Sequence, residues 1–225
     1  RRIRPNITPA KINIFKRFGT AMIKFNNYNI EFVGARKESY SNDSRKPSIE
    51  EGTFLDDMLR RDFTINTLAI RLNKNYFGEL IDTFGGIDDI EKGTIKTPSD
   101  PNKTFSDDPL RMLRAIRFSC ELNFDIDMDT QNSIKKNSNR LEILSSERIS
   151  DEINKILMSE KPSNGFKNLE KLNLLNYILP ELINLKGVEE VEGQTHKDNF
   201  YHTLEVVDNI SRLSLIHISE PTRHH

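Results

Sequence analysis

The sequence has 225 residues, of which 36% are hydrophobic and 30% charged, so it is long enough for one large or two small polar folded domains. Its net charge of −1 excludes a protein that is strongly basic or acidic overall. A single cysteine, Cys120, excludes a disulfide framework and a cysteine-only zinc site. Polar residues interrupt every long apolar stretch, so we predict no membrane-spanning segment and expect a protein of the reducing cytoplasm.

The first part of the chain favours β-strands. Short apolar runs separated by turn-forming residues predict strands at 12–15, 21–25 and 30–33. Up to residue 36 the only acidic residue is Glu31, among many lysines and arginines. This basic region suits a polyanion such as nucleic acid or nucleotide phosphate, although a solvated basic face is an equal alternative. Residues 39–53 have the composition of a loop.

Helical patterns dominate further along the chain. Apolar residues at helical spacing predict a helix from Asp56 to Leu72, and residues 80–86 predict a short strand followed by a glycine turn. After Asp100 the pattern predicts helices at 109–122, 129–137, 146–158, 165–174 and from about 201 onward. Strands first and helices later indicate an α+β fold rather than an α/β fold.

Adjacent arginines open the first motif that could carry chemistry, Arg-Arg-Asp-Phe-Thr-Ile-Asn-Thr-Leu-Ala at residues 60–69. Guanidinium groups bind phosphate oxygens in a bidentate way, and short polar side chains one turn further on can bind a ribose. The candidates are Arg60, Arg61, Asp62 and Asn66. The alternative is an amphipathic helix with ordinary surface ion pairs.

Regularly spaced arginines mark the second motif, Ser-Asp-Asp-Pro-Leu-Arg-Met-Leu-Arg-Ala-Ile-Arg-Phe. Asp108 precedes a proline and is predicted to cap a helix. Arg111, Arg114 and Arg117 recur every three residues, so they follow one side of that helix. Asp108 and Arg111 together offer acceptors and donors that can match a Watson–Crick base edge. A capped, salt-bridged helix is the alternative.

Three further segments are given structural or incomplete roles. The aspartates around Gly85–Gly86 are expected to stabilise a turn, and residues 146–153 are expected to form a helix with i,i+4 ion pairs. His196 and His202 do not make a complete metal site by themselves.

Residues 213–223 match one reading frame of a transposase adapter used in preparing sequencing libraries, so we suspect read-through of artificial DNA over 213–225.

Taken together, the motifs resemble those of the class II tRNA nucleotidyltransferases (CCA-adding enzymes) and the bacterial poly(A) polymerases. Their order and spacing agree from about Glu31 to Leu157. The resemblance implies an α+β fold: part of a nucleotidyltransferase head with a mixed sheet and helices, followed by an all-helical neck and body. The implied divisions are the head at 1–99, the neck at 100–160, the body at 161–195 and the start of an HD-type domain at 196–212.

The resemblance also implies roles for individual residues. Asp108 and Arg111 would read the incoming base, and Arg61, Arg114 and Arg117 would hold the nucleotide. Ribose and phosphate support would come from Arg60, Asp62 and Asn66. Asp107 stands where the family has glutamate. His202 is a candidate metal ligand of the HD-type domain.

The function implied by the resemblance is the addition of CMP and AMP, from CTP and ATP, to the 3′ end of tRNA without a nucleic-acid template. The family binds Mg²⁺ through an Asp-x-Asp pair that follows a Gly-Gly loop. Both motifs are expected before Phe15 and neither is present, which leaves Glu31 as a candidate third carboxylate. We therefore expect an enzymatic parent protein and an inactive 225-residue chain. The alternatives are an ATP-only poly(A) polymerase, an HD-type phosphohydrolase and a non-catalytic RNA-binding module.

Overall fold

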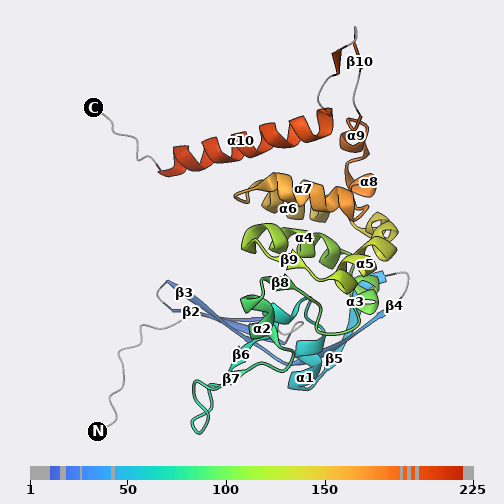
Figure 1. Ribbon diagram of the computed structural model, residues 1–225. Coiled ribbons are helices and arrows are strands. Elements are labelled where there is room, and N and C mark those ends of the chain that lie inside the picture. The colour runs from blue at the N-terminus through green and yellow to red at the C-terminus, as the bar shows by residue number, and fades with distance from the viewer. Residues whose placement is uncertain are drawn as a thin grey trace, which may run out of the picture.

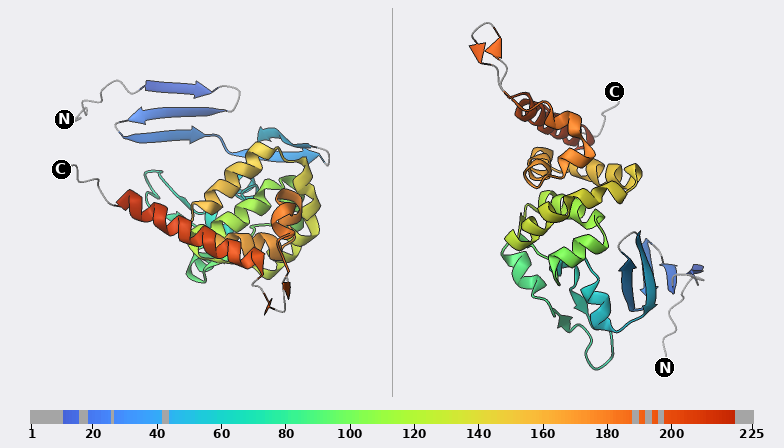
Figure 2. Two further views of the ribbon diagram at one scale, coloured as in Figure 1. Left: turned by 90° about the horizontal axis from the view of Figure 1, so that it is seen from above. Right: turned by 90° about the vertical axis from the view of Figure 1, so that its right-hand side faces the viewer.

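A computed structural model describes residues 11–15, 19–25, 27–41, 44–187, 190–191, 194–195 and 198–219. Strands dominate its first part (Figure 1). An antiparallel three-stranded sheet has the order β1-β2-β3, with bounds β1 (Lys11–Phe15), β2 (Thr20–Phe25) and β3 (Tyr28–Val33). The three strands predicted in this region are confirmed. Figure 2 shows this sheet beside the helices rather than among them, and all of β3 is exposed.

A second ribbon contradicts the prediction of a loop at 39–53. Strands β4 (Arg36–Ser41) and β5 (Ser44–Glu51) pair antiparallel, with a register shift between Ser39 and Ser41. The loop prediction was wrong because it relied on serine, asparagine and proline content. Backbone pairing with a neighbouring strand satisfies the peptide groups whatever the composition, and a ribbon edge tolerates proline.

The helix predicted from Asp56 to Leu72 is also wrong as a single element. Helix α1 (Phe54–Leu59) ends early and is followed by a 3₁₀ turn, η2 (Thr64–Asn66), and by strand β6 (Ala69–Ile70), which pairs with β7 (Leu80–Ile81). Thr64 N donates to the carbonyl of Lys96 at 2.8 Å, so a tertiary contact replaces a helical bond. The apolar spacing instead places Phe63 in the core, where it is fully buried.

A glycine turn leads into the helical part, as predicted. Gly85 has φ 72°, a conformation that glycine adopts without strain, and it caps α2 (Gly86–Glu91). The carboxylate of Asp82 accepts the Gly86 and Ile87 amides at 2.7 and 3.0 Å. Burial raises the pKa of Asp82, but hydrogen bonds from these amides outweigh it and the net pKa is lowered. This supports the structural reading of the turn.

The remaining elements are mainly helices, and the predicted helices are confirmed to within a few residues. Strands β8 (Thr94–Ile95) and β9 (Asp125–Ile126) pair in parallel. The helices are α3 (Pro101–Asp107), α4 (Leu110–Leu122), α5 (Met128–Asn137), η3 (Ser138–Ile143), α6 (Ser146–Leu157), α7 (Pro162–Lys171), α8 (Leu175–Ile178), α9 (Pro180–Ile183) and α10 (Asn199–Ser219). A short hairpin, β10 (Glu190–Val191) with β11 (Gln194–Thr195), precedes α10.

The hydrophobic core lies within the stack of helices that Figure 1 shows above the strands. Met112, Leu113 and Ile116 of α4 are fully buried against residues such as Ile156 of α6 and Leu169 of α7. Burial of each such side chain stabilises the fold by roughly 1.5–3 kcal/mol. The packed helices α4, α6 and α7 therefore form the support that holds the polar side chains on the exposed edge of α4.

Two further observations bear on the sequence-based predictions. Among the described residues, no helix combines the length and the hydropathy needed to cross a membrane. Helix α10 extends to Ser219, whereas His196 and residues 220–225 of the suspected adapter segment lie outside the described residues.

Candidate nucleotide-binding site

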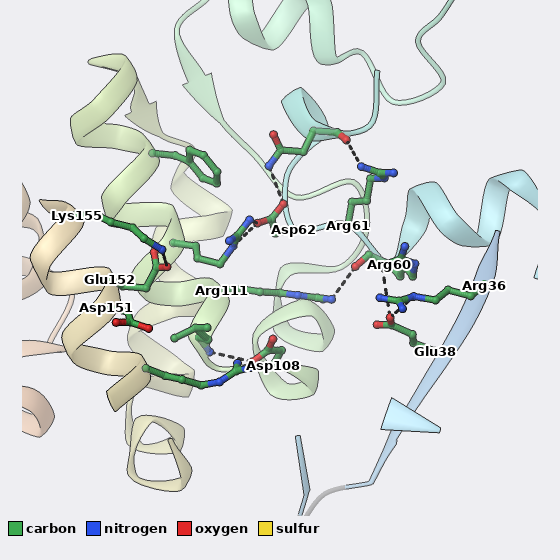
Figure 3. A pocket seen from close by; sticks show the side chains of 15 residues that line it. Arg36, Glu38, Arg60, Arg61, Asp62, Asp108, Arg111, Asp151, Glu152 and Lys155 are labelled. Carbon is green, nitrogen blue, oxygen red and sulfur yellow. Dashed lines mark hydrogen bonds and ion pairs between the residues drawn. The ribbon is translucent and has the colours of Figure 1, made fainter. Parts of the chain in front are cut away.

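An open cleft of about 790 Å³ separates β4 and the segment after α1 from the helices α4 and α6 (Figure 3). It brings together the two arginine motifs, which are about fifty residues apart in the sequence. Its polar lining residues are Arg36, Glu38, Arg60, Arg61, Asp62, Asn66, Asp108, Arg111, Arg114, Arg148, Asp151, Glu152 and Lys155, with Leu110 and Phe118 as the apolar ones. All the predicted nucleotide-contact residues except Arg117 lie in this lining.

The α1 end of the cleft is built by a capping box. Thr53 Oγ1 accepts the Asp56 amide at 3.2 Å, and Asp56 Oδ2 accepts the Thr53 amide at 2.8 Å. These bonds satisfy amides that the helix cannot pair internally. Since α1 is held at its start and ends at Leu59, Arg60 and Arg61 emerge at the cleft rather than continuing a helix.

Asp62 joins this segment to α4. Its Oδ2 accepts Nε and Nη2 of Arg114, both at 2.6 Å, and its Oδ1 accepts Nδ2 of Asn66 at 2.8 Å. The Asp62 residue is only 7% exposed, so these charge-assisted bonds form largely away from water. Asp62 therefore fixes the orientations of Arg114 and Asn66 on opposite sides of the cleft.

Asp108 and Arg111 lie at the junction of α3 and α4. Asp108 is the C-cap of α3 and Pro109 occupies the N-cap of α4, so the predicted placement of Asp108 as the N-cap is wrong by one residue. The carboxylate still accepts the Leu110 amide, at 3.2 Å, because the junction turns tightly there. Arg111 Nη2 donates to the carbonyl of Arg60 at 2.7 Å. The proposed base-reading pair is thus attached to both halves of the cleft.

Arg117 lies outside the cleft lining. Its Nε donates to Glu152 Oε2 at 2.7 Å, and its Nη1 lies 3.1 Å from Glu121 Oε2. The guanidinium also stands 4.1 Å from the centre of the Phe118 ring. The three arginines of α4 therefore diverge: Arg111 and Arg114 line the cleft, while Arg117 ties α4 to α6.

Sequence reasoning missed the wall formed by α6. Arg148, Asp151, Glu152 and Lys155 all line the cleft, whereas the helix had been given a purely structural role. Glu152 does not form the expected i,i+4 ion pair. Its buried carboxylate instead accepts hydrogen bonds from Arg117 and from Lys155, the latter at 2.8 Å. The four residues follow i, i+3, i+4, i+7 spacing, which places them on one helix face and was the available signal.

Arg36 and Glu38 were missed for a different reason: Arg36 was counted only as part of the basic region up to residue 36, and no strand was predicted to continue through residue 38. Arg36 Nε lies 2.9 Å from Glu38 Oε1, and Arg60 Nη1 lies 3.4 Å from the same oxygen. The Glu38 side chain is only 5% exposed. Strand β4 thus contributes one cation and one buried anion to the cleft.

Three other predicted or discussed residues lie away from the cleft. Glu31 is exposed on β3, and His202 is exposed on α10 with its Nδ1 3.9 Å from Glu205. Asp107 borders a smaller neighbouring pocket. Burial raises the pKa of Asp107, and the nearby Lys103, Arg111 and Arg140 oppose that rise only in part.

Comparison with known proteins matches the chain to two family descriptions. Residues 3–96 match "Poly A polymerase head domain", and residues 123–185 match "Probable RNA and SrmB- binding site of polymerase A". The chain belongs to the poly(A) polymerase and tRNA nucleotidyltransferase family. Its α+β architecture also agrees with the solved structures of that family.

Two curated family members are similar over most of the chain. The CCA-adding enzyme of Limosilactobacillus reuteri (strain DSM 20016) is 40% identical over 163 residues, which are 71% of this chain and 39% of the relative. The A-adding tRNA nucleotidyltransferase of Geobacter sulfurreducens is 36% identical over 195 residues, or 85% of this chain and 22% of the relative. The chain therefore spans less than half the length of these relatives.

A solved family structure agrees in fold as well. It is a tRNA nucleotidyltransferase complexed with a primer tRNA and an incoming ATP analogue, with a TM-score of 0.64 and 28% identity. The match covers 78% of this chain and 51% of that one.

Proposed function

We propose that this chain is the nucleotide-selecting part of a cytoplasmic tRNA nucleotidyltransferase that adds CMP and AMP, from CTP and ATP, to tRNA 3′ ends without a nucleic-acid template. The observation that carries the proposal is the cleft. Its lining brings together Asp108, Arg111 and Arg114 of the helical part with Arg60, Arg61, Asp62 and Asn66 of the head. Figure 3 shows Asp108 and Arg111 facing Arg60 across it. The relatives' names support the same chemistry.

Each group in the cleft has a chemical task in this proposal. Asp108 accepts and Arg111 donates hydrogen bonds at the edge of the incoming base, so that protein groups do the work of a template strand. Arg61 and Arg114 neutralise phosphate oxygens, and Asn66, oriented by Asp62, faces the ribose. We give Arg117 a positioning part only, because it lies outside the cleft lining and joins α4 to Glu152 of α6.

The family resemblance implies Mg²⁺, which would neutralise the triphosphate and activate the attacking 3′-hydroxyl. Over the described part of the chain, no group of three or more histidine, cysteine, aspartate or glutamate side chains could hold a metal ion. Glu31 is exposed and outside the cleft lining. The described residues do not fit the ion, so no step of the reaction is assigned to a metal on this chain.

Equilibrium binding of CTP, ATP, GTP and UTP to the 225-residue chain tests the proposal. We expect CTP and ATP to bind more tightly than GTP and UTP, and Arg111→Ala to abolish that preference. Arg71→Ala is the matched control, since Arg71 pairs with Glu79 on the β6–β7 hairpin, away from the cleft. No preference among the four nucleotides, or equal effects of both substitutions, would overturn the proposal.

An ATP-only enzyme is the second candidate, and the A-adding relative from Geobacter sulfurreducens favours it. The same titration separates the two functions. Tight binding of ATP with CTP no better than UTP indicates an A-adding enzyme or a poly(A) polymerase. Comparable affinity for CTP and ATP indicates CCA addition.

A further inference from the structure

A buried carboxylate behind the cleft is engaged by both arginines of the first motif. Asp57 Oδ1 accepts Nε of Arg60 at 2.9 Å and its Nη2 at 2.5 Å. Asp57 Oδ2 accepts Nη2 of Arg61 at 3.2 Å. Asp57 itself is 8% exposed and does not line the cleft, whereas Arg60 and Arg61 both do.

This arrangement belongs to a longer alternation of charge. Glu38 of β4 lies between Arg36 and Arg60, and Asp57 of α1 lies between Arg60 and Arg61. The order is therefore Arg36, Glu38, Arg60, Asp57, Arg61, a sequence of cations separated by carboxylates. Without Asp57, the guanidiniums of Arg60 and Arg61 would repel each other. Arg60 would keep only the weaker contact with Glu38 at 3.4 Å, and Arg61 only the Asn66 carbonyl at 3.2 Å, so each would lose a carboxylate that fixes its plane.

The Arg60 backbone connects Asp57 to the helical part. The carbonyl of Arg60 accepts Arg111 Nη2 at 2.7 Å, and Arg60 is the C-cap of α1. The side chain of Arg60 is held by Asp57, so the position of its carbonyl depends on the same anchor. Arg111 is one half of the pair that we propose reads the base.

We propose that Asp57 is a positioning residue for nucleotide recognition, which sets the geometry of Arg60 and Arg61 and, through the Arg60 carbonyl, of Arg111. The inference rests on the proposed function of the cleft. Asp57 touches no ligand; its effect passes through the two guanidiniums and the α1 terminus.

If Asp57 is removed, a positioning role and a purely electrostatic role predict opposite changes in ATP affinity. Removing a carboxylate makes the cleft more positive, so an unstructured polyanion should bind as well as before or more tightly. A nucleotide depends in addition on the directions of the arginine donors, so its binding should weaken. A ratio of ATP affinity to inorganic tripolyphosphate affinity that falls because ATP binds more weakly therefore reports positioning, since added positive charge alone would tighten the binding of both anions.

The test measures that ratio by calorimetry for the 225-residue chain and its Asp57→Asn variant. We expect the ratio to fall about tenfold, which corresponds to one typical charged hydrogen bond, with tripolyphosphate affinity unchanged or increased. The matched control is Asp56→Asn. Asp56 is the neighbouring acid of α1, and its carboxylate completes the Thr53 capping box instead of pairing with a guanidinium. Its backbone carbonyl, which the substitution leaves in place, accepts the Arg60 amide at 3.2 Å.

The outcomes separate the two proposals. If the unmodified chain fails to bind ATP, the proposed function is overturned. If it binds ATP and Asp57→Asn leaves the ratio unchanged, or Asp56→Asn lowers it equally, the positioning role is overturned while the proposed function stands.

A second variant decides the matter if Asp57→Asn does not fold. Asp57→Glu keeps the charge but moves the carboxylate by one methylene, so we expect a smaller fall in the ratio, about threefold. An unchanged ratio in this folded variant would overturn the positioning role.

Discussion

The pair between Asp62 and Arg114 joins the head segment to α4, and its removal should weaken the fold measurably. The Asp62 side chain is 9% exposed and accepts two bonds of 2.6 Å from Arg114. Breaking a fully buried ion pair by removing one partner costs about 3–5 kcal/mol. The Arg114 side chain is 34% exposed, so water compensates part of that cost. We expect Asp62→Ala to lower the free energy of unfolding by about 2–3 kcal/mol.

A double-mutant cycle isolates the pair from other effects of the substitutions. Arg114 also stands 5.3 Å from the centre of the Phe118 ring, and Asp62 also binds Asn66, so neither single variant reports the pair alone. We expect a coupling free energy of about 1.5–3 kcal/mol between Asp62→Ala and Arg114→Ala, measured by urea unfolding.

The matched control is the exposed pair Arg71–Glu79, at 3.6 Å with side chains 42% and 50% exposed. Its coupling should be at most about 0.5 kcal/mol. The reasoning is wrong if the two pairs give the same coupling, since burial and geometry would then have no bearing on the strength of the contact between Asp62 and α4.

Three other predictions test local features. Gly86→Ala should cost about 1–3 kcal/mol in urea unfolding, because the added Cβ would lie 2.5 Å from the Thr64 carbonyl oxygen; Gly34→Ala, with its nearest atom at 4.0 Å, should cost less than about 0.5 kcal/mol. Burial raises the pKa of Cys120 to about 12. Iodoacetamide at pH 8 should therefore alkylate the native chain at least about 100-fold more slowly than the urea-unfolded chain, and comparable rates would contradict this. Burial raises the pKa of Asp57, but Arg60 and Arg61 outweigh it and the net pKa is lowered. The stabilisation from the Asp57 carboxylate is therefore present above its unfolded pKa and is lost as pH falls through the lower folded pKa. Asp57→Asn should thus flatten the acid limb of stability measured between pH 5 and 3, and an unchanged slope would count against this assignment.

The sequence predicted the helical half of the molecule well, because there local pattern and tertiary structure agree. The segments of α4, α5 and α6 each show apolar residues at helical spacing, and the structure places those residues in one core. The same rule failed at residues 56–72. There the apolar residues Phe63 and Leu68 surround a turn, and contacts from Lys96 and β7 replace helical bonds.

The sequence indicated the arginine motifs of the candidate site, but it did not indicate the residues of β4 and α6 that complete its lining. The two arginine motifs were found because guanidinium groups bind phosphate oxygens in a bidentate way and because both motifs resemble those of the family. Asp57 was passed over because its partners follow it by three and four residues, the spacing of an ordinary ion pair on the surface of a helix. Its importance comes from burial, which spacing does not report.

The charge balance of the cleft explains how a chain with a net charge of −1 can carry so many arginines at one site. Asp57 and Glu38 form ion pairs with Arg60. Asp62 pairs with Arg114, and Glu152 pairs with Lys155. Such pairing lowers the local positive potential, which weakens binding of any polyanion that relies on charge alone. It also fixes the directions in which the guanidinium donors point, which favours a ligand whose oxygens match them. The cleft is therefore arranged to discriminate by geometry, and affinity for a nucleotide should depend less on salt concentration than affinity for tripolyphosphate.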